Sequence, residues 1–302
     1  MSSPTEERVK KALEQFQQAI RLDPNFAPPY SGVADALLLG DDWYFSPTEV
    51  MPKAKAAAEK ALQLDDTLAE AHFSLGAAKF QYEYDWPGAE TEFRRAIELN
   101  PSFGFGHDQY GFFLALRGRL YDAVAESRLA TELDPLSPFA AANMAVPLTY
   151  QTKYAAAKEQ CRKALALDPN NWYGQFALGW IDTQSGKFNE AATELQQARA
   201  MDSPPFVAGW LGYAYAKSGE RTKAEATITE LNQTSSQRYV SPYLTAIIYL
   251  GLGDKRRSLD GLEKAYEERD WFLLSLKMNK AFDPLRSEPR FIALLKNLNL
   301  DK

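Results

Sequence analysis

Cysteine and histidine are almost absent from this chain of 302 residues, which contains one cysteine and two histidines. The single cysteine, Cys161, excludes an intrachain disulfide, so we expect a reducing compartment, the cytoplasm. The extracytoplasmic face of a membrane-anchored parent protein stays the alternative. A metal site needs three or more converging ligands. We therefore expect no metal ion and no cofactor, and a partly buried structural role for His72 and His107.

A net positive charge and long apolar runs are also lacking. The formal net charge is −6, which argues against nucleic-acid binding by this chain. No apolar run approaches the length of a membrane-spanning helix, so we expect no membrane insertion. The sequence contains neither a phosphate-binding loop nor a nucleophile with a histidine near it. We therefore assign no catalytic residue and expect no enzyme.

Residues that favour helices are abundant, and alternating β-branched patterns are scarce, so the chain reads as all-α. The stretch from Ala89 to Pro101 shows the pattern most clearly. Ala89, Phe93 and Ala96 share one helical face, and charged residues fill the other. Pro101 cannot continue the helix. The sequence predicts a short amphipathic helix that ends at the proline.

This helix recurs along the chain at a nearly constant spacing. The counterparts of Ala89 follow one another at spacings of 42, 35, 34, 34, 34, 33 and 34 residues: Ala12, Ala54, Ala89, Ala123, Ala157, Ala191, Ala224 and Ser258. A second helix precedes each copy and carries a large residue followed by a small one, as in Leu75-Gly76 and Leu178-Gly179. Glycine turns join the two helices. Self-similarity at this period indicates a repeat array.

The large–small pair, the Ala-x3-Phe-x2-Ala pattern and the following proline resemble the tetratricopeptide repeat. The resemblance covers residues 5 to 269 and implies a right-handed superhelical solenoid of antiparallel helix pairs. We interpret the chain as a half repeat and about seven repeats followed by a C-terminal helical cap packed on the last repeat: 5–26, 27–68, 69–103, 104–137, 138–171, 172–204, 205–238, 239–269 and the cap 270–302. Lys79 and Asp182 occupy positions where the family prefers an aromatic residue or leucine, so their helices are expected to pack less tightly.

The half repeat matches only the second helix of a repeat. It is either a short capping helix or the start of a fragment excised from a longer protein. We favour the fragment, because terminal caps are usually polar and this helix keeps Ala12, Phe16 and Ala19.

The 42-residue unit carries an insertion, Asp41-Asp42-Trp43-Tyr44-Phe45. Its aromatic residues either pack locally or form an extra lip on a binding groove. After it, Ser46 is a candidate N-cap, Pro47 suits the first helical position, and Glu49 would complete a capping box. Phe45 and Val50 could form a hydrophobic staple.

The resemblance places the first helix of each repeat on the concave side of the superhelix. The residues expected to meet a partner there are largely aromatic: Phe73, Phe80, Asp108, Phe112, Asn143, Tyr150, Tyr173, Phe176, Trp180, Trp210, Tyr213 and Tyr243. Co-chaperone members of the family clamp a carboxylate with basic residues and asparagine at these positions, so we expect no such clamp here. We assign about half of the aromatic residues to the core and the others to binding hot spots.

These observations predict a non-enzymatic scaffold that binds a protein, as a peptide or partner helix, in an aromatic-lined groove. The alternative is a regulatory or sensor module of a larger bacterial signalling protein. The region from Tyr239 to Phe291 is similar to arrays attached to bacterial winged-helix regulators and serine/threonine kinases. In that case an effector domain N-terminal to this chain, or a small ligand, would be the partner.

Overall fold

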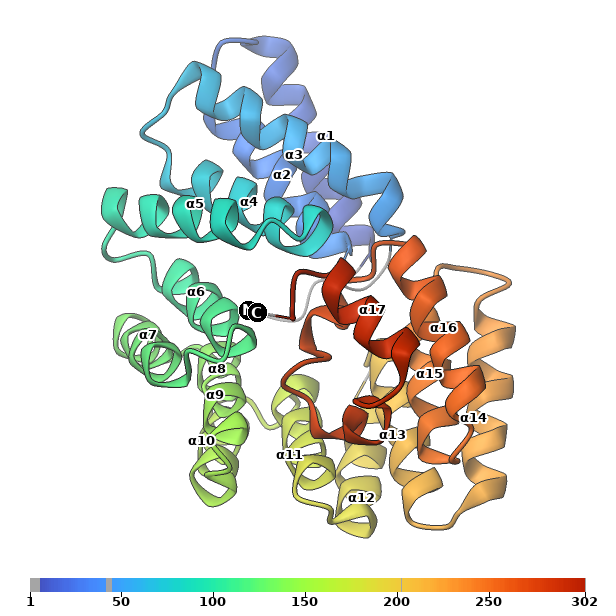
Figure 1. Cartoon of the computed structure of the whole chain (residues 1–302). Helices are drawn as coiled ribbons and strands as arrows, with labels where there is room; N and C mark the ends of the chain where they lie inside the picture. Colours follow the sequence, from blue (N-terminus) through green and yellow to red (C-terminus); the bar gives the residue numbers. More distant parts are fainter. Residues whose placement is uncertain (1–5, 42–44, 202, 302) are drawn as a thin grey trace. The chain divides into compact units, whose positions relative to one another are not determined.

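The computed structural model describes residues 6–41, 45–201 and 203–301, and within these ranges every regular element is a helix. The all-α prediction is therefore confirmed. The chain divides into two compact units. Unit 1 comprises Met1–Gly106 and Glu268–Trp271, and unit 2 comprises His107–Glu267 and Phe272–Lys302. Figure 1 shows the chain coloured from the N-terminus in blue to the C-terminus in red.

Unit 1 is built from consecutive helices that pack on one another: α1 (Glu6–Leu22), α2 (Pro28–Asp41), α3 (Pro47–Leu64), α4 (Ala69–Ala78), the π-helical η1 (Lys79–Glu83) and α5 (Trp86–Leu99). Helix α2 also contacts α4, the first helix of the next pair. Helix α1, which corresponds to the expected half repeat, packs on α2. There the ring of Phe16 lies against Gly32, where a Cβ atom would have no room.

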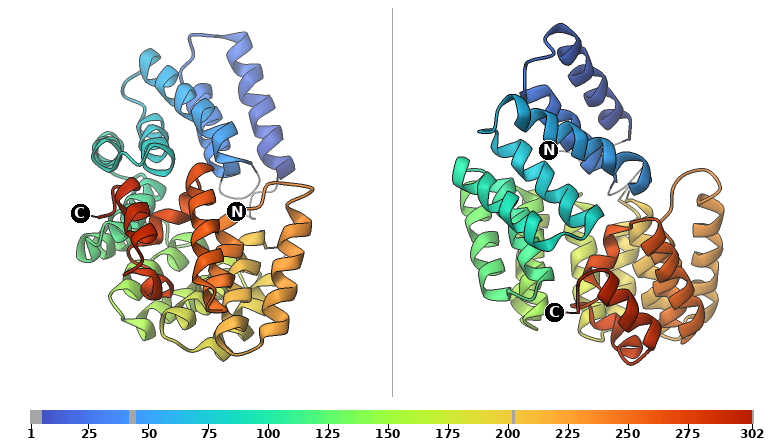
Figure 2. Two further views of the ribbon diagram at one scale, coloured as in Figure 1. Left: turned by 45° about the vertical axis from the view of Figure 1, so that its right-hand side comes forward. Right: turned by 45° about the horizontal axis from the view of Figure 1, so that its top comes forward.

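Helix α6 (Gly104–Leu116) begins in unit 1 and continues into unit 2. The other α-helices of unit 2 are α7 (Leu120–Leu133), α8 (Pro138–Asn143), α9 (Ala145–Tyr150), α10 (Tyr154–Leu167), α11 (Trp172–Gln184), α12 (Phe188–Arg199), α13 (Pro205–Lys217), α14 (Arg221–Thr234), α15 (Pro242–Gly251), α16 (Lys255–Glu267) and α17 (Pro289–Asn297). Two 3-10 helices, η2 (Trp271–Ser275) and η3 (Lys280–Leu285), precede α17. Helices α11 to α16 pack side by side in antiparallel pairs (Figure 2).

Small residues sit where paired helices cross, as the repeat pattern predicts. A Cβ atom added to Gly179 of α11 would lie 2.6 Å from Cγ of Leu195 in α12 and 3.2 Å from the carbonyl oxygen of Ala191. Ala191 and Ala198 of α12 are themselves completely buried. The backbones can approach this closely only because one side of the contact lacks a side chain, and Leu195 fills the space that remains.

The turns between paired helices also follow the sequence. Gly118, Gly186, Gly219 and Gly253 have φ values of 77°, 79°, 88° and 84°, in the left-handed region that glycine adopts without a steric penalty. At the equivalent turn between α9 and α10 the residue is Thr152, with φ at 62°. That turn holds a non-glycine residue in a conformation that costs roughly 1 kcal/mol.

Helix α3 begins where the sequence predicts, with Ser46 at the N-cap and Pro47 at the first helical position. The capping-box prediction is wrong, because the Ser46 side chain makes no capping hydrogen bond. Its hydroxyl instead shares a 2.9 Å hydrogen bond with the Thr48 hydroxyl. Phe45 packs against Gly40, so this aromatic residue of the insertion packs locally. The inserted residues 42–44 lie outside the described residues.

Candidate functional site

A chain of hydrogen bonds links the first helices of three consecutive helix pairs in unit 2. The Tyr173 hydroxyl in α11 donates to Oδ1 of Asn143 in α8 over 2.7 Å. The Asn143 side-chain amide in turn donates to Oδ2 of Asp108 in α6, also over 2.7 Å. Gln109 donates to the same carboxylate oxygen over 3.0 Å. Three residues that the sequence places on the partner-facing side are thus brought together.

Asp108 is the least solvated member of this polar chain. Its side chain is only 2% exposed, and Oδ1 is buried without a hydrogen-bond partner among the described residues. Burial raises the pKa of Asp108 to about 7, although the hydrogen bonds from Asn143 and Gln109 lower it. An acid of this kind changes its charge near neutral pH. The polar chain therefore ends in a titratable group.

A break in the helix lies directly beside Asn143. The first helix of this pair is interrupted between α8 and α9 at Met144, and Pro147 lies four residues after Asn143. Proline has no backbone N–H and would clash with the carbonyl of the residue four positions earlier. The regular i→i−4 hydrogen bond is therefore missing at Asn143, and the helix restarts as α9. Pro147 is visible in the sequence, but the alignment of the repeats does not by itself predict the break in the helix.

Aromatic rings extend from the polar chain across the first helices of the next pairs. Phe139 and Tyr173 are stacked with ring centroids 5.0 Å apart. Tyr173 stacks on Phe176 at 6.2 Å, and Phe176 contacts Phe206 of α13 at 4.4 Å. Phe139, Tyr173 and Phe206 are only half-buried. This row of rings has both a packed side and a side that solvent reaches.

The structure buries most of the residues that the sequence assigns to partner binding. Three of the twelve keep half-exposed side chains: Phe112, Tyr150 and Tyr173. The others are buried: Phe73, Phe80, Asp108, Asn143, Phe176, Trp180, Trp210, Tyr213 and Tyr243. Fully packed rings cannot meet a ligand without rearrangement, so the partially exposed residues carry the binding hypothesis.

The buried aromatic residues, together with the half-exposed Tyr150, form local clusters. In unit 1, Phe73 lies 5.7 Å from Phe93, and Phe80 lies 5.1 Å from Trp86. In unit 2, Trp180 packs edge-on against Tyr150 at 5.6 Å, and Trp210 against Tyr213 at 5.8 Å. Burial raises the pKa of the Tyr150 and Tyr213 hydroxyls above the ordinary tyrosine value. These rings stabilise the packing of each pair.

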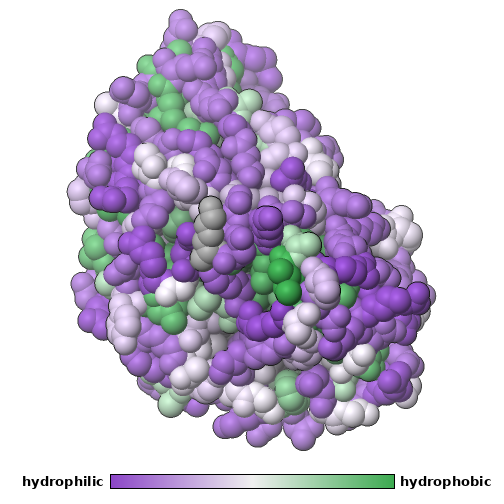
Figure 3. Space-filling model, in the orientation of Figure 1, coloured by the Kyte–Doolittle hydropathy of each residue, from purple (hydrophilic) through white to green (hydrophobic). Residues whose placement is uncertain are grey.

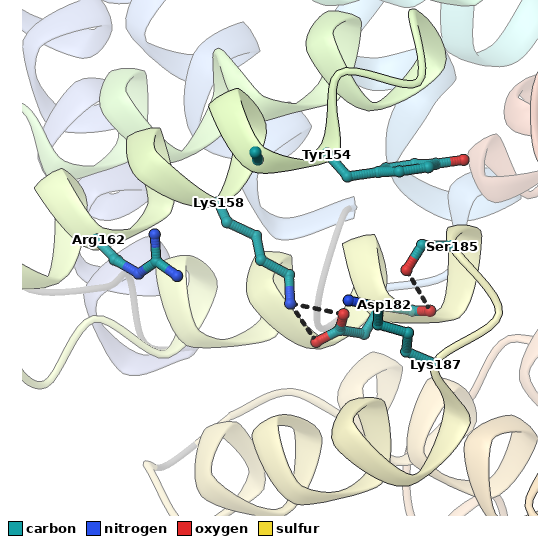
Figure 4. Close-up of a pocket in the computed structure, with 7 residues that line it drawn as sticks. Tyr154, Lys158, Arg162, Asp182, Ser185 and Lys187 are labelled. Atoms are coloured by element: carbon teal, nitrogen blue, oxygen red, sulfur yellow. Dashed lines mark hydrogen bonds and ion pairs between the residues drawn. The ribbon is translucent and has the colours of Figure 1, made fainter.

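A pocket of about 460 Å³ opens between α10 and the end of α11 (Figure 4). Lys158 of α10 and the buried Asp182 of α11 point toward each other there and form an ion pair with N–O distances of 2.6 and 2.7 Å. Arg162 of α10 also lines this pocket (Figure 4). Because Lys158 neutralises a buried carboxylate, it is not available to a ligand. Asp182 departs from the repeat pattern, and Lys158 neutralises its buried charge within the fold.

Both histidines join the two helices of their own pair. Nδ1 of His72 donates to Glu92 over 2.7 Å, and Nδ1 of His107 donates to Glu126 over 2.6 Å. Burial would raise the pKa of Glu92, but hydrogen bonds from Lys79 and His72 outweigh it and hold this pKa below its ordinary value. Cys161 is buried, which raises the pKa of its thiol to about 12 and keeps it unreactive.

Within the described ranges, no group of three or more His, Cys, Asp or Glu side chains is arranged to hold a metal ion. No helix in the described part of the chain combines the length and the apolarity that a membrane crossing requires. The face drawn in Figure 3 is mostly hydrophilic, with small separate apolar areas.

The sequence pattern does not predict that C-terminal residues lie against the row of aromatic rings. Phe272 stacks on Phe206 with centroids 4.8 Å apart and ring planes 6° apart. Gln184, at the end of α11, donates to Asn279 over 2.9 Å. The apolar tail itself is visible in the sequence, but its contacts join residues 95 positions apart, which no local pattern can reveal.

Paired helices at a 34-residue period, with small residues at their crossings, define the tetratricopeptide-repeat fold. The chain has this fold. It is similar to the solved structure of a tetratricopeptide repeat protein from Parabacteroides merdae, with 12% identity and a TM-score of 0.59 over 82% of this chain and 93% of that one. It is also similar to a chain of the APC/C hetero-tetramer Cut9–Hcn1, with 16% identity and a TM-score of 0.62 over 96% of this chain and 52% of that one.

Sequence comparison adds distant relatives. The chain is 21% identical over 210 residues to Superkiller protein 3 of Schizosaccharomyces pombe, which covers 67% of this chain. It is 23% identical over 265 residues to the human protein O-mannosyl-transferase TMTC3, which covers 87% of this chain. The chain spans only 14% and 24% of the length of these two relatives. No protein-family model matches it.

Proposed function

We propose that this chain is a non-enzymatic scaffold that binds a peptide segment or helix of a partner protein. The binding surface is the Phe139–Tyr173 surface, which we define as the half-buried rings of Phe139 and Tyr173 with Asn143 and Asp108 behind them. Phe112 lies one helical turn after Asp108 and extends this surface along α6.

The observation that carries the proposal is the hydrogen-bonded chain from Asp108 through Asn143 to Tyr173. It fixes the orientation of the Tyr173 ring, which stacks on Phe139. Rigid aromatic rings with one accessible face supply large contact area at little entropic cost, and such rings dominate binding energy at interfaces. A surface of this kind suits the apolar side chains of a docked segment.

Catalysis has little support in the molecule. In the pocket lined by Tyr154, Lys158, Asp182 and Ser185, Lys158 and Asp182 are paired with each other. The name of TMTC3 refers to mannosyl transfer, but this chain matches only 24% of that protein. We therefore propose no transferase activity.

Affinity capture tests the proposal. The tagged full chain, Phe139→Ala and the control Tyr121→Ala would be incubated with lysate of the source organism, and bound proteins identified by mass spectrometry. Tyr121 is a suitable control, because it is 83% exposed on α7. We expect a partner retained by wild type and Tyr121→Ala, and bound about 30-fold more weakly by Phe139→Ala, in line with the loss of about 2 kcal/mol at a hot spot.

A partner that binds Phe139→Ala and wild type equally would show that the Phe139–Tyr173 surface is not the site. The alternative role, a sensor module that contacts its own effector domain, leads to a different result. In that case the captured partner would be the effector domain itself.

A further inference from the structure

The C-terminal segment, defined as residues 272–300, lies across the first helices of several helix pairs in unit 2 (Figure 1). Its 3-10 helix η3 contacts both α11 and α15, and Phe272 contacts Phe206 of α13. Near its end, the carbonyl of Asn299 accepts a hydrogen bond from Arg117, the residue that follows α6, over 3.5 Å. Helices of a repeat array pack on their sequence neighbours, whereas this segment crosses several repeats.

Gln184 of α11 binds this segment in the way that a receptor binds a peptide. Its side-chain NH2 donates to Oδ1 of Asn279 over 2.9 Å, and its Oε1 accepts the backbone N–H of Lys280 over 3.1 Å. Asn279 is 1% exposed and also accepts the backbone N–H of Ala281. One side-chain amide thus fixes both the register and the backbone of the segment.

Aromatic contacts continue this interaction on the neighbouring helices. Phe272 lies between Phe206 of α13 and Tyr243 of α15, with centroids 4.8 and 5.5 Å away. Tyr243 also contacts Phe282, at 5.8 Å. Leu274 and Leu276 of the segment are completely buried. The face of α11, α13 and α15 therefore accepts phenylalanine and asparagine side chains of the segment.

The segment does not continue the repeat pattern. It consists of two 3-10 pieces, turns and one helix of nine residues, α17. Short 3-10 helices are weakly stable by themselves. The conformation of residues 272–285 therefore depends on the surface to which they are bound, as does that of a docked peptide.

We infer that the C-terminal segment is an intramolecular ligand that occupies the face formed by α11, α13 and α15. This face is a binding site for a phenylalanine- and leucine-rich segment with a central asparagine. An outside segment of the same chemistry can reach it only by displacing residues 272–300. Occupation of this face by residues 272–300 does not depend on the proposed scaffold function. Only its biological consequence, the regulation of partner binding, rests on that function.

The effective concentration of the C-terminal segment determines how strongly it competes with a free peptide for the face. A ligand joined to its site by a short connection has an effective concentration on the order of 1 mM. A free peptide that binds the empty face with a Kd of about 10 μM would therefore bind the intact chain about 100-fold more weakly.

A peptide supplied in trans tests this inference without any outside partner. The probe is a fluorescent synthetic peptide with the sequence of residues 272–301. The receptor is the full chain with Phe272→Ala and Asn279→Ala, which weaken the segment in cis and leave α11, α13 and α15 unchanged. We expect the peptide to bind this variant about 100-fold more tightly than wild type, and to raise its Tm by about 5 °C at a concentration 100-fold above the Kd.

Three controls make the result specific. A peptide that carries the same two substitutions should not bind. Adding Gln184→Ala to the receptor should weaken binding about five- to ten-fold, whereas adding Tyr121→Ala should change nothing. If the double variant does not fold by circular dichroism, Asn279→Ala alone serves as the receptor.

Two outcomes would overturn the inference. If a folded receptor neither binds the peptide nor gains thermal stability from it, the segment is an inseparable part of the core. If wild type forms dimers that exchange their C-terminal segments, the ligand belongs to a second copy. An absence of partners for the Phe139–Tyr173 surface would contradict the proposed function and leave this result unaffected.

Discussion

Asp108→Asn should change how the stability of unit 2 depends on pH. Burial raises the pKa of Asp108 from 3.8 to about 7. Between about pH 4 and pH 7, folded wild type therefore holds a proton that the unfolded chain releases, so its stability falls as the pH rises through this window. Above about pH 7 both states are deprotonated at this residue, and the loss is complete.

The magnitude follows from the pKa change. A rise from 3.8 to about 7 corresponds to about 4 kcal/mol of lost stability at pH 8, at about 1.4 kcal/mol for each tenfold change. Asparagine avoids this cost and keeps an oxygen to accept the Asn143 hydrogen bond, but it loses roughly 1 kcal/mol of charge-assisted bonding. We expect Asp108→Asn to be about 3 kcal/mol more stable than wild type at pH 8 and slightly less stable at pH 4.5.

Hydrogen exchange by mass spectrometry is the appropriate assay, because two compact units need not unfold together. Peptides from α8 and α11 report on unit 2 after correction for the intrinsic pH dependence of exchange. Asp35, whose pKa burial raises to about 6, lies in unit 1, so Asp35→Asn is the control and should leave those peptides unchanged. The same change in protection for wild type and Asp108→Asn between pH 4.5 and pH 8 would contradict this prediction.

The remaining predictions concern packing and ion pairs. Trp180→Ala should destabilise unit 2 by about 3 kcal/mol in hydrogen exchange, because the ring is buried; a fully stable variant would contradict its core position. Lys158→Met should cost about 3 kcal/mol by leaving Asp182 buried and unpaired, and Lys158→Met with Asp182→Leu should recover most of this loss. The lowered pKa of Glu92 contributes stability that is present above its ordinary pKa and lost as the pH falls through the folded value. Acid unfolding of unit 1 should therefore be shallower in Glu92→Gln.

The repeat architecture could be predicted from the sequence because its determinants are local. Small residues at helix crossings and glycines at turns recur every 34 residues or so, and each acts within one helix pair. Gly179 against Leu195 shows this directly, since the two residues lie in adjacent helices. Ser46 shows the limit of such rules, because a neighbouring Thr48 hydroxyl was enough to replace the expected capping bond.

The residues of the proposed surface could be predicted only in part. Helical position predicts that Asp108, Asn143 and Tyr173 face the same side, and hydrogen bonds join the three side chains. It could not show which aromatic rings stay accessible, because burial depends on what covers the face. Tyr243, for example, is 1% exposed, and it contacts Phe272 and Phe282 of the C-terminal segment. The contact of these two phenylalanines with α15 depends on the tertiary structure, and the periodicity of the sequence does not predict it.

The C-terminal segment also has a consequence for the order of folding. Hydrogen bonds between the two helices of a pair join residues about 20 positions apart, as in His107 with Glu126. The bonds that hold the segment join residues 95, 96, 126 and 182 positions apart. Contacts that close long loops form late, since the entropy of closure is lost before the contact is gained. Refolding should therefore show fast formation of helix pairs and a slower final phase in which Phe272 and Asn279 become protected.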